Sequence, residues 1–487
     1  MMLFPATSVR GMIWVPQRTM EFVMRNAAFE ELMSLRQLEM PSEQIMVTGQ
    51  DPILPTRFSL GDSTAAIFSA IGVAVNDLWE LRTGNRQQLG IDVTHAAATL
   101  KSFEYLKDHG AATEEAWLAR QTRAGISLPH PTRDGRHFLP HMGMPHLAKR
   151  ILKILDCDYE LQAVKKALLQ WDALDLENAV AEVNACGAMV RSQQEWLSHP
   201  HGELMVRRPV IEITRIGDSD PVPLSDSGKA SRPLSGVKVL DLTRILAGPT
   251  CARTLAEHGA DVLMVTAEHL PQVDRFVKDT SHGKRSCYLD LTIADEKDKL
   301  LSLVRNADVF SQGYRPGSME KLGLAAEQLA EIRPGIIYTS MNCYGYEGPF
   351  KDRAGWEQLA QTVTGIAHEH GGDRPSLLPA AACDYSTGYL AAYGTLLALG
   401  LRARMGGSYH VRAALCQSAM FLQRQPRVES GDQELGIDVS ELEAVLQEQQ
   451  SAHGSIGFLG PVLTMSETPP RWSIPSPKLG EHNPVWS

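Results

Sequence analysis

The middle of the chain alternates between short apolar strands and helices, and this alternation limits the fold more than any other feature of the sequence. Val237–Leu242 is a run of apolar and β-branched residues that predicts a strand, and a Gly-Pro turn follows it. Further strands are predicted at Asp261–Thr266, Asp308–Ser311 and Gly335–Met341. The helices predicted between them cover about 250–258, 300–306, 318–322 and 325–332. This pattern predicts parallel βαβ units, so we expect an α/β fold with a doubly wound, Rossmann-like parallel sheet.

The loops after these strands are the expected place for a ligand. Open parallel sheets bind ligands beyond the carboxyl ends of their strands. The loops concerned are Arg244–Pro249, Gln312–Gly317 and Asn342–Arg353. Functional side chains are therefore expected in three segments that lie far apart in the sequence.

Two segments of the chain resemble each other without a gap. LGDSTAAIFSAIGVAVNDLWELRTG, from Leu60, aligns with ACDYSTGYLAAYGTLLALGLRARMG, from Ala382, at a constant offset of 322 residues. In this alignment Asp62 meets Asp384, and an Arg and a Gly coincide at the end of each apolar stretch. Chance similarity between two helices rich in small residues is the alternative, but it does not explain why charged residues also coincide. We predict a partial internal duplication.

The net charge argues against one broad class of protein. The 487 residues carry a formal net charge of −10, whereas a nucleic-acid-binding protein normally presents a basic face. An anionic ligand must therefore be held by local basic residues. We expect neither a nucleic-acid partner nor a membrane partner, because the longest apolar runs, such as Ala65–Val75, are too short to span a bilayer.

The seven cysteines are scattered, and they form neither a CxxC pair nor a spacing with His that is typical of zinc. An odd, dispersed set indicates reduced thiols, and we expect no metal site. The N-terminus shows no secretory signal, and the terminal Val-Trp-Ser is not a peroxisomal address. The expected location is the cytoplasm.

Asp384 is the candidate for chemistry that stands out in the second repeat. It lies at the start of an apolar helix expected over Tyr389–Leu401, so its carboxylate suits an N-cap that accepts backbone N–H groups. A carboxylate at a helix N-terminus in an apolar setting also suits a nucleophile for acyl transfer. Spacing does not decide between the two interpretations.

From Pro233 onward, five blocks occur in the order and spacing of one known family. The blocks are PLSGVKVLDLTRILAGPTCARTLAEHGADVLMV, GKRSCYLDL, GYRPGSMEKLGL, CYGYEGPFKDRAGWEQLAQTVTGI and DYSTGYLAAYGTLLALGLRARMGG. They resemble the family III CoA-transferases (the CaiB/BaiF family), which include formyl-CoA transferase, carnitine CoA-transferase and the α-methylacyl-CoA racemases. The resemblance covers about 233–421, and about 51–202 resembles part of a second copy.

The resemblance implies roles for six residues. Asp384 occupies the position of the family's catalytic Asp, and Glu357 matches an acidic residue near the active site. Four basic residues match positions that contact coenzyme A: Lys284, Arg285, Arg315 and Lys321. The implied reaction moves coenzyme A from an acyl-CoA thioester to a carboxylic acid through an aspartyl anhydride and an aspartyl-CoA thioester. Both substrates are small molecules, and no tightly bound cofactor is implied.

Departures from the family pattern leave alternatives open. α-Methylacyl-CoA racemases carry a His where this chain has Trp356, so His368 or His370 would have to substitute from a polar stretch that we expect to be a loop. Leu246 replaces a Gln of the formyl-CoA branch, which favours an apolar acyl group over formate or oxalate. A non-catalytic acyl-CoA-binding homologue is the remaining alternative.

The resemblance also suggests how the chain is divided. We expect 1–217 to be a partial copy, with its helical half and a smaller α+β domain, and 218–233 to be a linker rich in Ser, Pro and Asp. We expect 234–425 to carry the nucleotide-binding sheet and the catalytic Asp, and 426–487 to be a C-terminal tail segment. Asp62 would be a relic that caps its helix. Family members commonly form dimers, so a homodimer is one expectation, and the same pairing within one chain is the other.

Overall fold

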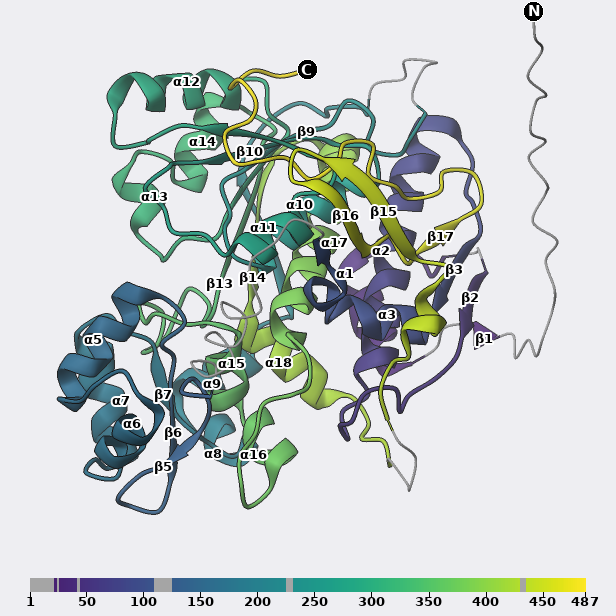
Figure 1. Ribbon diagram of the computed structural model, residues 1–487. Coiled ribbons are helices and arrows are strands. Elements are labelled where there is room, and N and C mark those ends of the chain that lie inside the picture. Colours follow the sequence, from purple (N-terminus) through teal and green to yellow (C-terminus); the bar gives the residue numbers. More distant parts are fainter. Residues whose placement is uncertain (1–21, 24–25, 42–43, 109–124, 225–230, 430–434) are drawn as a thin grey trace, which may run out of the picture.

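A seven-stranded sheet lies at the centre of the computed structural model, which describes residues 22–23, 26–41, 44–108, 125–224, 231–429 and 435–487 (Figure 1). Its strands lie in the order β11 (Lys284–Tyr288), β10 (Asp261–Thr266), β9 (Lys238–Asp241), β12 (Val309–Gln312), β13 (Ile337–Asn342), β14 (Ser408–Ala414) and β8 (Ile211–Gly217). Neighbouring strands are parallel except β14 and β8, which are antiparallel. The predicted doubly wound α/β fold is confirmed.

The strand order reverses direction between β9 and β12. From β9 the chain adds β10 and β11 on one side, and then returns to add β12, β13 and β14 on the other. The loops that leave the carboxyl ends of β9 and β12 therefore diverge over opposite faces of the sheet and open a crevice between them. This topological switch point fixes where a ligand can enter.

Alternate residues of the strands face two different helix layers. Val239, Val262 and Val309 belong to one hydrophobic cluster, together with α10 (Ala247–Glu257) and α17 (Ala382–Met405). Their neighbours Leu240 and Leu263 belong to a second cluster. That cluster contains α12 (Ala294–Val304), α13 (Ser318–Lys321) and α14 (Ala326–Ile332). Burial on both faces explains why these strands are nearly continuous apolar runs in the sequence.

Three strands of this sheet were not expected from the sequence. β11 begins with Lys284 and Arg285, β14 contains His410 and Arg412, and β8 alternates apolar residues with polar ones. The apolar content of β11 and β14 is too low for the period-2 pattern to identify them, whereas the alternation in β8 is a signal that could have identified it. Tertiary pairing with the apolar central strands makes them part of the sheet.

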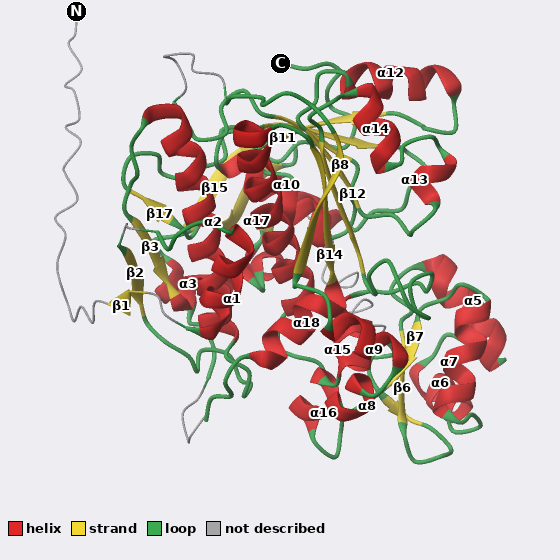
Figure 2. Cartoon of the chain, turned by 180° about the vertical axis from the view of Figure 1, so that it is seen from behind, coloured by secondary structure: helices red, strands yellow, loops and turns green. Residues whose placement is uncertain are grey.

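A smaller α+β domain forms a separate lobe, which both Figure 1 and Figure 2 show below the central sheet. Its antiparallel strands are β5 (His130–Pro131), β6 (His137–Pro140) and β7 (Gly187–Met189), and its helices include α5 (Pro145–Leu155), α6 (Leu161–Leu168) and α7 (Ala173–Glu182). Ile151, Val164 and Leu176 belong to a hydrophobic core of its own. The expected smaller domain is present.

The two ends of the chain are joined by strand pairing. One sheet contains β1 (Phe22–Val23), β2 (Ile45–Thr48), β3 (Leu89–Asp92) and β17 (Thr464–Met465), and another contains β15 (Leu446–Ser451), β16 (Gly454–Leu459) and β4 (Lys107–Asp108). The C-terminal segment therefore adds strands to the N-terminal half. In return β8, from the N-terminal half, completes the central sheet.

The two similar segments form matching helices. α2 (Leu60–Thr83) and α17 each have 24 residues, begin at equivalent positions and pack against each other. Each is followed by a strand, β3 or β14, that pairs in parallel with the strand before the helix. We propose, on this basis, that the segments are copies. The expectation that Asp62 caps α2 is wrong, because Ser59 is the N-cap residue and Asp62 lies inside the helix.

α2 is long and apolar enough to cross a membrane by length and composition, although its longest apolar run in the sequence is short. In the structure, 89% of its most apolar window is buried inside the protein. It contacts α1 (Ala27–Arg36), α3 (Val93–Thr99) and α17. The apolar surface of α2 is used for packing in the core.

Gly388 allows α17 to pack closely on α10. A Cβ atom at this position would lie 2.4 Å from the carbonyl oxygen of Ala247 and 2.7 Å from the Cβ of Thr250. Because a backbone carbonyl cannot move aside cheaply, we expect Gly388→Ala to lower the free energy of unfolding by about 1–3 kcal/mol, measured by urea denaturation. Gly400→Ala in the same helix is the control, since its Cβ would meet only the flexible guanidinium of Arg404 at 3.1 Å. Equal losses in both variants would contradict this account of the contact.

Candidate active site

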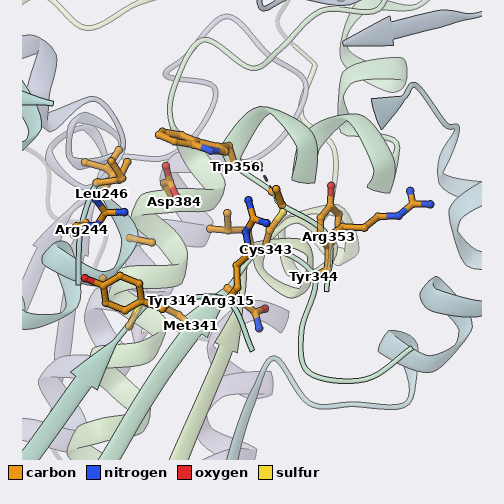
Figure 3. A pocket seen from close by; sticks show the side chains of 18 of the residues that line it. Arg244, Leu246, Tyr314, Arg315, Met341, Cys343, Tyr344, Arg353, Trp356 and Asp384 are labelled. Carbon is orange, nitrogen blue, oxygen red and sulfur yellow. Dashed lines mark hydrogen bonds between the residues drawn. The ribbon is translucent and has the colours of Figure 1, made fainter. Parts of the chain in front are cut away.

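A cavity of about 380 Å³ opens at the switch point between β9 and β12. The loops after β9, β12 and β13 line it, and all three predicted loops contribute. A further wall belongs to α5 of the smaller domain. The cavity therefore lies between the two domains, and Figure 3 shows the side chains around it.

Asp384 is the third residue of α17 and lines this cavity, with 8% of its surface exposed. Figure 3 shows its carboxylate below the ring of Trp356. The N-cap of α17 is Ala381, so Asp384 does not serve as the cap. Within the described part of the chain, no donor forms a hydrogen bond with the Asp384 carboxylate. Its oxygens therefore stay available to a ligand in the cavity.

Glu357 binds the backbone of the first turn of α17, at Asp384 and the residue before it. It is buried at the start of α15 (Glu357–Thr364). Its carboxylate accepts hydrogen bonds from the backbone N–H groups of Cys383, at 3.1 Å, and Asp384, at 2.5 Å. The side-chain amide of Gln361 donates a third, at 2.5 Å. Glu357 thus provides the helix cap that the sequence suggested for Asp384, and it fixes the backbone of Asp384.

The pKa values of the Asp384 and Glu357 carboxyl groups are both raised. Burial raises the pKa of Asp384 well above its usual value, and the charge of Glu357 raises it further. Burial also raises the pKa of Glu357 to about 7, against the opposing effect of its hydrogen bonds. The pair therefore titrates together, and a neighbouring cation would favour ionisation of Asp384.

Basic residues line the same cavity as this carboxylate, although the protein as a whole is acidic. Four basic residues line the cavity: Arg244, Arg315, Lys351 and Arg353. Arg353 is paired with Glu177 of the smaller domain at 3.3 Å. Arg244, Arg315 and Lys351 have no carboxylate partner within the described residues. Uncompensated positive charge in one place is what an anionic ligand requires.

Lys284, predicted to contact coenzyme A, is completely buried away from the cavity lining. Its ammonium group donates to a carboxylate oxygen of Asp241 at 2.7 Å and to the carbonyl oxygen of Pro249 at 2.8 Å. Burial lowers the pKa of Lys284, and the charge of Asp241 opposes this shift. Its observed contacts join β11 to β9 and to the start of α10.

The other predicted basic residues have different positions. Arg285 pairs with Asp261 at 2.8 Å and donates to the carbonyl oxygen of Val485, outside the cavity lining. Lys321 is exposed at the end of α13 and does not line the cavity either. Of the four basic residues predicted, the structure brings Arg315 to the cavity.

Much of the remaining wall is apolar. Leu246, Met341, Trp356 and Leu415 line the cavity with Asp384. The residue before Leu246, Ile245, has a φ of 74°, which is a rare and strained conformation for a β-branched side chain. Strain of this kind costs about 1–3 kcal/mol and persists only where surrounding structure imposes it. The backbone is thus bent unfavourably at the start of α10, where it meets the cavity.

The histidines considered as racemase acid–base groups lie elsewhere. His368 and His370 belong to α16 (Ile366–Gly371), so the expectation of a loop here is wrong. Neither lines the cavity, and His370 lies 3.3 Å from the hydroxyl of Thr56. In the described part of the chain, no group of three or more His, Cys, Asp and Glu side chains is placed to hold a metal ion.

Several lining residues were not identified from the sequence. Arg244, Lys351 and Arg353 lie in the loops that were predicted, and their basic character was the signal that could have singled them out. His146 belongs to α5 and Met144 is its N-cap, and both precede every strand of the central sheet in the sequence. Their position could not be inferred, because nothing in the local pattern shows where the smaller domain docks.

Comparison with known proteins agrees with this geometry. The family model described as CoA-transferase family III matches residues 234–436. The chain is 30% identical over 417 residues to the acetyl-coenzyme A transferase nodX of Hypoxylon pulicicidum, covering 77% of this chain and 70% of that protein. It is 29% identical over 411 residues to an acyl-CoA transferase of Gibberella moniliformis, covering 75% of this chain and 70% of that protein.

A shorter match extends to bacteria. The beta subunit of the succinyl-CoA–L-malate CoA-transferase of Chloroflexus aurantiacus is 35% identical over 210 residues, which cover 40% of this chain and 51% of that subunit. The cavity, its carboxylate and the fold around them all lie in the part of the chain that the family model matches, apart from the wall that α5 supplies. The chain belongs to the family III CoA-transferases (the CaiB/BaiF family), enzymes that transfer coenzyme A.

Proposed function

We propose that this protein transfers coenzyme A from an acyl-CoA thioester to a carboxylic acid, with Asp384 as the nucleophile. The observation that carries the proposal is an unpaired carboxylate in a cavity at the switch point of the sheet, with three basic side chains that lack carboxylate partners. A carboxylate needs no prior deprotonation by a base once it is ionised, and it forms an anhydride that is reactive enough to continue.

The proposed reaction has four balanced exchanges. An Asp384 oxygen attacks the thioester carbonyl, the C–S bond breaks, and coenzyme A leaves as a thiolate. The thiolate then attacks the Asp384 carbonyl, which releases the donor acid as a carboxylate and leaves an aspartyl-CoA thioester. The acceptor carboxylate displaces the thiolate to form a second anhydride. Finally the thiolate attacks the acceptor carbonyl, which restores Asp384 and yields the new acyl-CoA.

Glu357 is proposed as a positioning residue for this chemistry. Its carboxylate bonds to the backbone N–H of Asp384 and does not line the cavity, so it acts on the reaction through Asp384. It fixes the direction of the nucleophile, and its charge keeps the pKa of Asp384 high. A carboxylate with a raised pKa is a stronger nucleophile when ionised.

The start of α10 supports the stabilisation of the negative oxygen that develops on the attacked carbonyl. Ala247 and Gly248 are the first residues of the helix and line the cavity. Backbone N–H groups in the first turn of a helix have no partner within the helix. Fixed donors of this kind favour the charge that forms during acyl transfer.

The walls support an apolar acyl group as the one transferred. Leu246, Met341 and Leu415 offer no hydrogen bond to a second carboxylate. Against these side chains a compact dianion such as oxalate would lose hydration that an apolar acyl group does not have. We therefore propose an apolar acyl group, in agreement with the expectation from Leu246.

The cytoplasm is proposed as the location. All seven cysteines are free in the structure, and six of them are buried. Thiols that remain unpaired are typical of reducing compartments.

Replacement of the nucleophile tests the proposed function directly. Asp384→Asn is expected to lower kcat by at least about a thousandfold, because an amide cannot form the anhydride. Incubation with acyl-CoA followed by hydroxylamine should convert Asp384 of the wild-type protein into a hydroxamate, found by mass measurement of its peptide. Asp62→Asn is the matched control, because Asp62 is also the third residue of its helix and its N–H is also bound by a carboxylate, that of Asp51, at 2.8 Å.

Two outcomes would contradict the proposal. One is an Asp384→Asn variant that transfers coenzyme A as well as the Asp62→Asn control does. The other is binding of acyl-CoA without any adduct, which would favour the acyl-CoA-binding alternative. Deuterium uptake at the α-carbon of the acyl group without transfer would support the racemase alternative instead.

The pH dependence tests the role of Glu357. Because burial raises the pKa of both carboxyl groups, and the charge of Glu357 raises that of Asp384 further, the pair holds a proton at low pH and the nucleophile is lost. We expect kcat/KM to fall as the pH is lowered. In Glu357→Gln the neighbouring charge is absent, so Asp384 should ionise more easily and the acidic limb should move to lower pH. A limb that stays in place while kcat falls would show that Glu357 has a structural role only.

A further inference from the structure

A histidine and an arginine of the smaller domain lie near two arginines of the sheet loops at the cavity. His146 and Arg150 lie one turn apart on α5, and His146 lines the cavity together with Arg244 and Arg315. The pKa of His146 is lowered by partial desolvation and then by the charges of Arg150, Arg315 and Arg244. All three arginines therefore lie close enough to act on the imidazole. We call these four residues the basic cluster.

Asn184 of the smaller domain orients two members of the cluster. Its carbonyl oxygen accepts a hydrogen bond from Arg150 at 2.8 Å, and its side-chain oxygen accepts one from Arg315 at 3.4 Å. Asn184 has a φ of 54°, a conformation that Asn tolerates better than most residues. Two guanidinium groups from different domains are therefore held at one residue, instead of separating as like charges would.

The basic cluster lacks compensating carboxylates. Within the described residues none of its members forms an ion pair with Asp or Glu, and its arginines donate to neutral oxygens instead, Arg244 to the carbonyl of Pro271 at 3.0 Å. The protein as a whole has a net charge of −10, so acidic residues are abundant elsewhere. A local group of cations without partners is unfavourable unless an anion joins it.

The carboxylate of Asp384 lies deep in the cavity and the basic cluster lies nearer the surface, and this arrangement matches the shape of coenzyme A. Asp384 is 8% exposed, whereas Arg150 and Arg315 are exposed to solvent. Coenzyme A carries its thioester at one end of an uncharged pantetheine arm and its phosphates at the other. A ligand whose thioester reaches Asp384 can thus leave its phosphates beside exposed cations. An acceptor carboxylate must react at Asp384 itself, so it would leave the cluster unsatisfied.

We propose that the basic cluster binds the phosphate groups of the CoA nucleotide, and that His146 and Arg150 of the smaller domain are therefore part of the substrate site. The inference rests on the proposed function for the identity of the ligand. Arg is suited to this task because its planar guanidinium bonds to phosphate oxygens in pairs. The CoA site is then shared between the two domains, in place of the buried Lys284 and the paired Arg285.

Titration calorimetry of the full chain with coenzyme A tests the proposal. We expect Arg150→Gln and His146→Gln each to weaken binding about tenfold or more, since charge-assisted hydrogen bonds are lost. Lys149→Gln is the matched control, because Lys149 is an exposed cation of the same helix that, unlike Arg150, has no hydrogen bond to Asn184 within the described residues. Its Kd should stay within about twofold of the wild-type value, given that exposed charges contribute little. Melting temperatures of the variants confirm that each is folded.

Two truncated ligands locate the contact. Arg150→Gln should have little effect on the binding of an acyl-pantetheine, which has no phosphate. Comparison with 3′-dephospho-CoA shows whether the 3′-phosphate or the diphosphate is the group recognised. Unchanged CoA affinity in Arg150→Gln and His146→Gln, or an equal loss in the Lys149→Gln control, would overturn the proposal.

The binding data also separate this proposal from the proposed function. Asp384→Asn should bind coenzyme A as the wild-type protein does. If the protein binds coenzyme A through the cluster but forms no new thioester, the proposed function fails and the binding site stands. If transfer proceeds and the cluster variants bind coenzyme A normally, the binding site fails and the proposed function stands.

Discussion

The position of α17 determines where the carboxylate of Asp384 lies. This helix is buried along nearly all of its 24 residues, and it packs on α10 and α2, which both contact it extensively. Its N-terminal N–H groups would be costly to bury without partners, by about 1–3 kcal/mol each. Glu357 accepts two of them and removes that cost. The result is a carboxylate at the cavity whose backbone cannot shift and whose oxygens are unpaired.

In the proposed reaction negative charge moves from Asp384 to the sulfur of coenzyme A and back again in each cycle. Basic residues of the sheet loops line the same cavity, although the protein is acidic overall. Helix α2 has a similar arrangement, because the N–H of Asp62 is bound by a buried carboxylate, Asp51. Asp62 does not line the cavity that Asp384 does. In our account the arrangement at Asp384 carries chemistry, and the arrangement at Asp62 serves only the packing of its helix.

The sequence predicted the sheet and the loops of the site, and it failed where distant parts of the chain meet. The apolar runs of β9, β10, β12 and β13 are buried on both faces, so their pattern is visible locally, whereas the strand order and its switch point came from the structure. Asp384 and Glu357 were identified by resemblance, and the structure places them in contact. Lys284 was expected beside coenzyme A, but a basic residue on an interior strand is as easily used for a buried ion pair, here with Asp241. The contribution of α5 depends on how one domain docks on another, which no local pattern records.

The central claim is tested most directly by measuring the transfer of an oxygen atom from the acceptor acid to Asp384. In the proposed mechanism the acceptor carboxylate becomes one half of an anhydride with Asp384. The thiolate then attacks the acceptor's carbonyl carbon, and the bridging oxygen, which came from the acceptor, leaves with Asp384. One acceptor oxygen must therefore remain on Asp384. After a single turnover with an acceptor acid labelled at both carboxylate oxygens with heavy oxygen, the account predicts one labelled oxygen in the peptide that contains Asp384, found by mass spectrometry, and no label on Asp62. Efficient transfer of coenzyme A with no label on Asp384 would contradict it.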